Sequence, residues 1–169
     1  YSQDRYGAIY SSDGETLYCM PRSNSRFSFG SYTVKEGTKK IHRYAFSGSR
    51  LHRVQLPRSL ETISQWAFNL CNNLELVIPV NVKIIEEFAL YGVKSVDLEK
   101  GNRYFYRDSV GALYCGKDRR LVYFPRKTKM PVYRYKVLKG TKVIDRYVFS
   151  ANNNIQEILL PSTIETVKE

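Results

Sequence analysis

The chain has few of the residue types that catalytic and metal sites use. Its 169 residues include two histidines and three cysteines, and Cys19, Cys71 and Cys115 show no CxxC or Cys/His spacing. Neither a zinc site nor a disulfide framework is therefore predicted. No apolar run approaches the roughly 18 residues that a membrane-spanning helix needs, and the first residues lack the layout of a signal peptide. We expect no membrane span in this sequence, no metal and no cofactor.

The sequence also has no recognisable set of catalytic residues. A Ser or Cys nucleophile needs a His and an orienting acid, but His42 and His52 each follow a predicted core residue and are interpreted as surface side chains. Glu86 and Glu87 are adjacent on an extended segment, so their carboxylates point apart. No glycine-rich phosphate-binding motif occurs. The sequence therefore predicts a protein that is not an enzyme.

The sequence does contain a repeat. Six positions recur after 22 residues: Ile41, Ala45, Phe46, Val54, Leu56 and Pro57 become Ile63, Ala67, Phe68, Leu76, Ile78 and Pro79. A period of about 20 to 29 residues is typical of a solenoid in which each unit buries its apolar face against the next. A third unit keeps Ile85 and Ala89 but has Leu90 in place of the phenylalanine and lacks the proline. Because Trp66 occupies the place of Tyr44, we expect it to pack across adjacent units.

The sequence also contains a second, longer repeat. Residues 7–22 match 111–126, and residues 32–46 match 135–149. The first of these pairs reads as a β-hairpin with its turn at Ser12-Asp13-Gly14, and we expect its strands to continue the stack. One solenoid domain is predicted over 1–169, as a fragment of a longer array. Its parts are a hairpin insert and connector (1–36), short repeats (37–100), a second hairpin insert (101–142) and resumed repeats (143–169), in which Ile155, Ile158 and Leu160 are expected in the core.

Positive charge is concentrated in one part of the chain. The formal net charge is +11, and residues 101–150 hold 13 basic against 3 acidic side chains. Within 117–146 the basic residues alternate with Tyr123, Phe124, Tyr133 and Tyr135. This mixture favours a polyanion, such as a sulfated glycan or an acidic partner, with nucleic acid the least favoured choice. Alternatively, the aromatics are core and the charges keep an exposed edge soluble. The candidate polyanion-binding residues are Arg119, Arg120, Arg126, Lys127, Lys129, Arg134 and Lys136.

The strands of the repeats supply a second candidate surface. Side chains alternate across a strand, so the residues between the buried positions should form an outward row, as on the extended binding faces of other solenoids. This row mixes charges with exposed aliphatic groups, which suits a protein ligand better than a polyanion; the same residues could also be merely solvated. The row comprises Arg53, Gln55, Glu75, Val77, Ser95, Asp97, Glu157 and Leu159.

Taken together, these motifs resemble those of a known family. The elements IxxYAF, LxxVxLP and PxxLExI, the hairpin GxLY…LxYFP and the restart GTKxIxxYxF are similar to the BspA-like leucine-rich repeats of bacterial surface proteins. The resemblance implies a mainly β fold, an α/β-type right-handed leucine-rich-repeat solenoid with little helix and inserted β-hairpins. It also implies a secreted or cell-surface protein that binds a host or matrix protein without catalysis. The alternatives are a polyanion binder and a structural spacer.

Overall fold

A computed structural model of the chain describes residues 1–21, 30–126, 131–150 and 152–168. The described residues form strands joined by turns and contain no helix, so the mainly β fold is confirmed whereas the α/β-type label is not. In a typical coil, β5 (Lys40–Ile41) and β6 (Arg53–Gln55) are joined by turns that bend at Tyr44 (φ 60°) and Gly48 (φ 71°). Left-handed residues interrupt a right-handed helix, so the connection turns instead of coiling.

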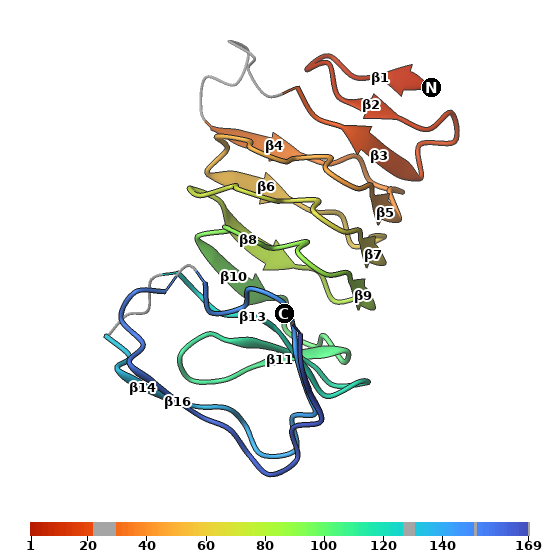
Figure 1. Ribbon diagram of the computed structural model, residues 1–169. Coiled ribbons are helices and arrows are strands. Elements are labelled where there is room, and N and C mark those ends of the chain that lie inside the picture. The colour runs from red at the N-terminus through yellow and green to blue at the C-terminus, as the bar shows by residue number, and fades with distance from the viewer. Residues whose placement is uncertain (22–29, 127–130, 151, 169) are drawn as a thin grey trace.

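Successive coils stack in register and build two faces (Figure 1). One face is a parallel four-stranded ladder, in which Arg53 pairs with Glu75 and Glu75 with Ser95. It consists of β4 (Ser31–Thr33), β6, β8 (Glu75–Ile78) and β10 (Ser95–Leu98). The other face is a six-stranded sheet of β1 (Ser2–Gln3), β2 (Ile9–Tyr10), β3 (Thr16–Cys19), β5, β7 (Thr62–Ile63) and β9 (Ile84–Ile85).

The core lies between these faces and consists of the residues that repeat in the sequence. Phe46 and Phe68 stack with their ring centroids 4.9 Å apart. Cys71 is fully buried beside them, and its thiol donates to the Phe46 carbonyl at 3.1 Å. The predicted core positions of the first three units are buried, except Leu98, which is half-buried: Ile41, Ala45, Phe46, Val54, Leu56, Ile63, Ala67, Phe68, Leu76, Ile78, Ile85, Ala89, Leu90 and Val96. Side-chain periodicity therefore identified the interior correctly.

The predicted N-terminal hairpin forms and continues the stack. Strands β2 and β3 are antiparallel, and the Asp13 carboxylate accepts the Glu15 N–H at 2.9 Å in their turn. Strand β3 then pairs in parallel with β5 of the first coil. This join is reinforced by a buried Tyr–Tyr–Asp cluster, in which the Tyr32 hydroxyl donates to Asp4 at 2.7 Å and lies 2.5 Å from the Tyr10 hydroxyl.

A row of aromatic residues follows the turn side of the solenoid. Tyr44, Trp66, Phe88 and Tyr147 occupy the same place in successive turns, each with φ between 57° and 61°. This left-handed conformation is unfavourable for residues with a side chain, by roughly 1–2 kcal/mol each. Stacking offsets part of that cost, because Trp66 lies parallel to both Tyr44 and Phe88, with centroid distances of 6.2 and 3.9 Å. The prediction that Trp66 packs across adjacent units is confirmed.

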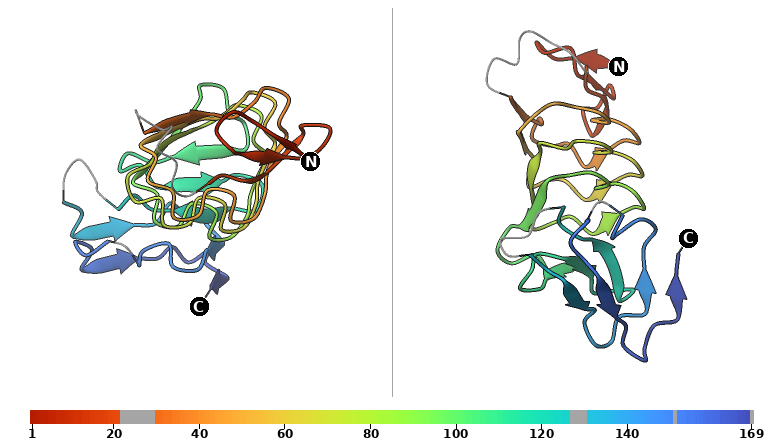
Figure 2. Two further views of the ribbon diagram at one scale, coloured as in Figure 1. Left: turned by 90° about the horizontal axis from the view of Figure 1, so that it is seen from above. Right: turned by 60° about the vertical axis from the view of Figure 1, so that its left-hand side comes forward.

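The second hairpin and the resumed repeats form a C-terminal unit at the far end of the stack, displaced to one side when seen along it (Figure 2). Its five-stranded sheet contains β11 (Phe105–Arg107), β12 (Leu113–Cys115), β13 (Arg120–Tyr123), β15 (Val143–Ile144) and β17 (Thr166–Val167). Strands β14 (Arg134–Lys136) and β16 (Glu157–Leu159) form a separate two-stranded sheet. The buried cluster recurs here as Asp108, Tyr135 and Tyr114.

Two residues expected in the core of the resumed repeats are exposed. Ile158 is 36% and Leu160 is 50% accessible, while Ile155 is half-buried. The physical reason is that β16 is an edge strand, paired only with β14. A repeat residue is buried by the coils on both of its sides, and here only one side is covered.

Candidate binding faces

A groove lies across the four-stranded ladder, where three successive coils present their outward residues. Its volume is about 550 Å³. Side chains alternate along β6 and β8 between buried and exposed positions, so every second residue reaches this surface. Six of the eight residues predicted for the strand row line the groove: Arg53, Gln55, Glu75, Val77, Ser95 and Asp97.

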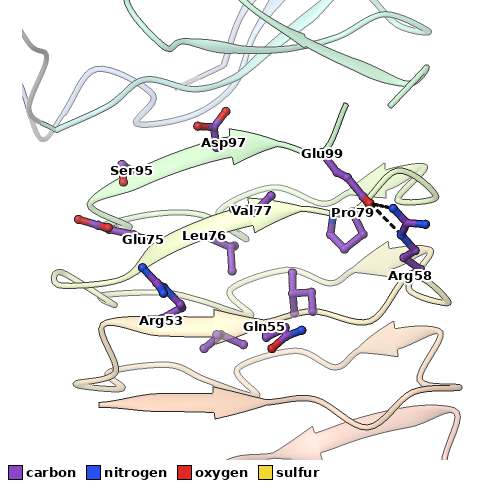
Figure 3. A pocket seen from close by; sticks show the side chains of 12 residues that line it. Arg53, Gln55, Arg58, Glu75, Leu76, Val77, Pro79, Ser95, Asp97 and Glu99 are labelled. Carbon is purple, nitrogen blue, oxygen red and sulfur yellow. Dashed lines mark hydrogen bonds and ion pairs between the residues drawn. The ribbon is translucent and has the colours of Figure 1, made fainter. Parts of the chain in front are cut away.

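The centre of the groove is apolar and its ends are charged (Figure 3). Val77 is 53% exposed in the middle of β8, with Pro79 following it at the end of the strand. Arg53 and Glu75 lie at one end, and Arg58 and Glu99 at the other. An exposed aliphatic group within a polar rim is the usual composition of a protein-binding patch.

Ion pairs fix the charged rim. The Arg58 guanidinium donates to Glu99 Oε1 at 2.8 Å, and Glu99 Oε2 accepts the Val80 N–H at 2.9 Å. These two contacts, the Val80 N–H first, lower the pKa of Glu99. At the opposite end, Lys94 binds Glu75 at 2.7 Å and lowers the pKa of its carboxyl. The lowered pKa favours the ionised form of both carboxyls, Glu75 and Glu99.

Arg58 and Glu99 also line the groove but were not predicted from the sequence. One feature of the sequence could have indicated Glu99. Glu99 stands where the first two repeats have Pro57 and Pro79, so the missing proline of the third repeat marks the place where a carboxylate enters the groove. Arg107 on β11 is a further missed residue, since it forms an ion pair with Asp97.

The strand row is not continuous over the whole chain, contrary to the prediction. Glu157 and Leu159 lie on β16, which belongs to the two-stranded sheet and not to the ladder. There they pair with Arg134 and Lys136 of β14, and Arg134 forms an ion pair with Glu157. Residues predicted for two different sites therefore share one small sheet.

The predicted polyanion-binding residues are dispersed. Arg119 is exposed at the turn between β12 and β13, Arg134 and Lys136 lie on β14, and Arg126 donates to Asn72. Lys127 and Lys129 lie outside the described residues. The seventh predicted residue, Arg120, is largely buried. The basic segment therefore does not form one patch among the described residues.

Arg120 is the clearest correction, because its side chain is only 14% exposed. Its guanidinium contacts Asp145 Oδ2 at 2.6 Å, Asp118 Oδ2 at 3.0 Å and the Ile85 carbonyl at 3.0 Å. The last contact reaches the final strand of the six-stranded sheet, β9. Arg120 thus joins the C-terminal unit to the third coil and is not presented to a ligand.

The aromatic residues of the basic segment support the interpretation that they are core. Tyr123, Phe124 and Tyr135 are between 3 and 5% exposed, and only Tyr133, at 58%, faces solvent among these four. Tyr123 also donates to the carbonyls of Val93 and Lys94 at 3.2 Å, across the junction with the third coil. Buried rings cannot stack on bases, so three of the four aromatics give no platform for a nucleic acid.

The residues considered for catalysis do not assemble into a site. His52 is exposed, and the His42 ring packs 5.1 Å from that of Tyr18. Glu86 accepts the Gln65 N–H at 2.7 Å, whereas Glu87 binds Lys168. Within the described ranges, no group of three His, Cys, Asp or Glu side chains could hold a metal ion. None of the described segments is a helix of the length and apolarity that crossing a membrane requires.

The sequence was compared with models of known protein families. The model of the BspA type leucine rich repeat region matches the chain in six copies, over residues 23–110 and 131–169. The chain belongs to this BspA-type leucine-rich-repeat family. A comparison with curated protein sequences gave no match.

Three solved structures have a similar fold. A leucine-rich repeat protein from Eubacterium ventriosum has 16% identity and a TM-score of 0.64, over 92% of this chain and 58% of its own. The pneumococcal vaccine antigen PcpA has 23% identity and a TM-score of 0.60, over 99% and 50%. A leucine rich cell surface protein from Faecalibacterium prausnitzii has 20% identity and a TM-score of 0.71, over 81% and 37%. The chain thus spans between 37 and 58% of the length of these proteins.

Proposed function

We propose that the chain is a non-catalytic protein-binding module of a cell-surface or secreted leucine-rich-repeat protein, and that the groove over β6, β8 and β10 is its ligand-binding face. The observation that carries this proposal is the position of Val77. Its side chain is half-exposed at the centre of a groove whose charged rim comes from three coils. Two of the structural neighbours support the location: one is described as a cell surface protein, the other as a vaccine antigen.

The composition of the groove indicates the kind of ligand. Arg53 and Arg58 face Glu75, Asp97 and Glu99 in the same groove, so its charge is mixed. A mixed rim selects a partner by charge complementarity, and its affinity falls only modestly with salt. A protein segment that places an apolar side chain over Val77 and opposite charges along the rim fits this surface, for example one from a host or matrix protein.

The test compares one substitution in the groove with a matched one outside it. Val77→Lys places a charge at the centre of the groove, whereas Ile84→Lys makes the same kind of change at a 51% exposed residue of β9, on the other face. Both variants, and the natural chain, are assayed against a panel of matrix proteins by surface plasmon resonance. Loss of a central apolar contact should weaken binding about tenfold or more for Val77→Lys.

The Ile84→Lys variant should bind as well as the natural chain. Moderate salt should reduce the affinity of both only modestly. If both variants bind alike, the groove is not the site. If a length-preserving replacement of the whole repeat segment in the parent protein leaves binding unchanged, the chain acts as a spacer.

A polyanion-binding function is the second candidate, favoured by the 13 basic against 3 acidic side chains of residues 101–150. Counterion release makes such binding fall steeply with salt. The matching variant replaces Arg119, Arg126, Lys127 and Lys129 by Gln and keeps Arg120, whose removal would leave the buried Asp145 with only its longer contact to Lys168, at 3.3 Å. Strong, salt-sensitive heparin binding that this variant abolishes would rank the polyanion function above the groove.

A further inference from the structure

A second cleft, separate from the groove, opens between the first three coils and the C-terminal unit. Its volume is about 620 Å³. His52, Asn73 and Lys94 come from the segments that precede β6, β8 and β10, and Arg126 and Asn154 come from the C-terminal unit. Residues far apart in the sequence therefore build one surface, and neither part of the chain forms it alone.

The lining of this cleft differs chemically from that of the groove. Four of its residues are asparagines, namely Asn72, Asn73, Asn153 and Asn154, and its charged residues are basic. Among the described residues that line it, none carries a carboxylate, whereas the groove contains three. The nearby Glu75 is held by Lys94 at 2.7 Å. The described side chains that line the cleft are therefore polar or basic, and the cleft is electropositive.

Some of the amides are structural, and others remain available. Asn72 accepts a hydrogen bond from Arg126, and Asn152 beside the cleft donates to the Pro125 carbonyl at 3.2 Å. These bonds hold the two walls in place. In contrast, the side chains of Asn73, Asn153 and Asn154 are exposed and make no hydrogen bond to another described residue. Each such amide offers both donors and an acceptor, as a vicinal pair of sugar hydroxyls requires.

We propose that this cleft binds an acidic saccharide, with Arg126 and Lys94 facing its anionic group and the asparagine amides facing its hydroxyls. Charge-assisted hydrogen bonds from a guanidinium suit both carboxylate and sulfate oxygens, so a uronic-acid ring and a sulfated ring share this chemistry. A pocket of this volume is in the range that holds a small ligand, roughly 300 to 1,000 Å³. This proposal rests on the polyanion function and gives it a defined site, which adjoins the groove through the Lys94–Glu75 ion pair but shares no lining residue with it.

The experiment measures binding of three hexasaccharides to the whole chain by isothermal titration calorimetry at low salt. The probes are a heparin-derived fragment, which is sulfated, a hyaluronan fragment, which is carboxylated, and the neutral maltohexaose. One acidic probe should bind with a stoichiometry of one, and maltohexaose should not. The better of the two acidic probes identifies the anionic group.

Two variants and one control locate the site. Arg126→Gln should weaken binding about tenfold or more, as loss of a charged hydrogen-bond donor does. The double variant Asn153→Ala, Asn154→Ala keeps the charge and should weaken binding several-fold, which a purely electrostatic attraction would not show. Arg103→Gln removes the same charge at an exposed residue outside the cleft and should bind like the natural chain.

Three results would overturn the proposal. One is the absence of binding by either acidic probe. The second is an equal loss in Arg103→Gln and Arg126→Gln, which would mean diffuse attraction by the net charge. The third is full binding by the double alanine variant. Circular dichroism of each variant confirms that it is folded, and Val77→Lys, which alters only the groove, should leave saccharide binding unchanged.

Discussion

Phe46 and Phe149 occupy matching places in two copies of the same motif, and they differ in how they are covered. Each ring packs against the tyrosine of its buried cluster, at 6.0 Å from Tyr32 and 5.9 Å from Tyr135. Phe46 is also stacked beneath Phe68 of the next coil and is 1% exposed. Phe149 is only half-buried.

This difference shows which part of a coil's stability is local and which part its neighbours supply. The hairpin and the Tyr–Tyr–Asp cluster are present in both units, with Tyr32 and Tyr135 each 3% exposed. Burial of the repeat residues, however, requires a coil on each side. In the outer coil of the C-terminal unit, Ile158, Leu160 and Val167 are between 36 and 54% exposed.

The comparison predicts unequal costs for the same substitution. Phe46→Ala should destabilise the chain by about 3–5 kcal/mol, because it leaves a cavity in a fully packed site. Phe149→Ala should cost less than about 2 kcal/mol, because a half-buried ring loses less transfer free energy and its site can collapse. Urea unfolding followed by circular dichroism measures both. Equal costs would show that the C-terminal unit is as well packed as the first coils.

The buried clusters should behave alike, which separates their contribution from that of the coils. Tyr32→Phe and Tyr135→Phe each remove the hydroxyl that joins an aspartate to a second tyrosine. Each change takes the hydroxyl donor away from the aspartate Oδ2, whereas the second tyrosine keeps a backbone N–H, so we expect a cost of about 1–3 kcal/mol in both. Tyr44→Phe, at a 49% exposed residue, is the control and should be nearly neutral. Hydrogen exchange assigns each loss to its own unit; a negligible effect of Tyr135→Phe alone would contradict the equivalence.

Periodicity was enough to predict the first three coils, because their apolar residues meet identical neighbours above and below. The turn sequence Ser12-Asp13-Gly14 predicted the first hairpin, and the structure shows that its strand β3 continues the stack by pairing in parallel with β5. Periodicity could not predict that Ile158 would be exposed, because burial at that position depends on an adjacent coil and not on the residue itself.

The binding faces were predictable only where they follow the repeat. Alternation along the strands identified Arg53, Glu75 and Val77 as neighbours. The burial of Arg120 depends on its contacts with Asp145, which is 25 residues away, and with the carbonyl of Ile85. The first unit has Thr16 and His42 at the positions that correspond to Arg120 and Asp145. The sequence repeat therefore does not predict an ion pair there.

Glu99 provides the smallest and most local test, because it replaces the prolines of the first two coils. Its pKa is lowered below the ordinary value of 4.5, mainly by the Val80 N–H and then by Arg58. A carboxyl with a lowered pKa stabilises the folded state above its ordinary pKa, and this contribution is lost as the pH falls through the folded value. The stability of the third coil should therefore decline in acid slightly earlier than that of the first two, which have Pro57 and Pro79 there.

A carbon-detected NMR titration of the Glu99 carboxyl measures this directly. Arg58→Gln should raise the pKa of Glu99 only part of the way to 4.5, since the Val80 N–H remains. Lys83→Gln, which removes a basic side chain bound to Glu61 instead, should leave the Glu99 titration where it was. A complete return to the ordinary value in Arg58→Gln would mean that the arginine alone holds the carboxylate. The backbone of the third coil would then contribute nothing to the charged rim of the groove.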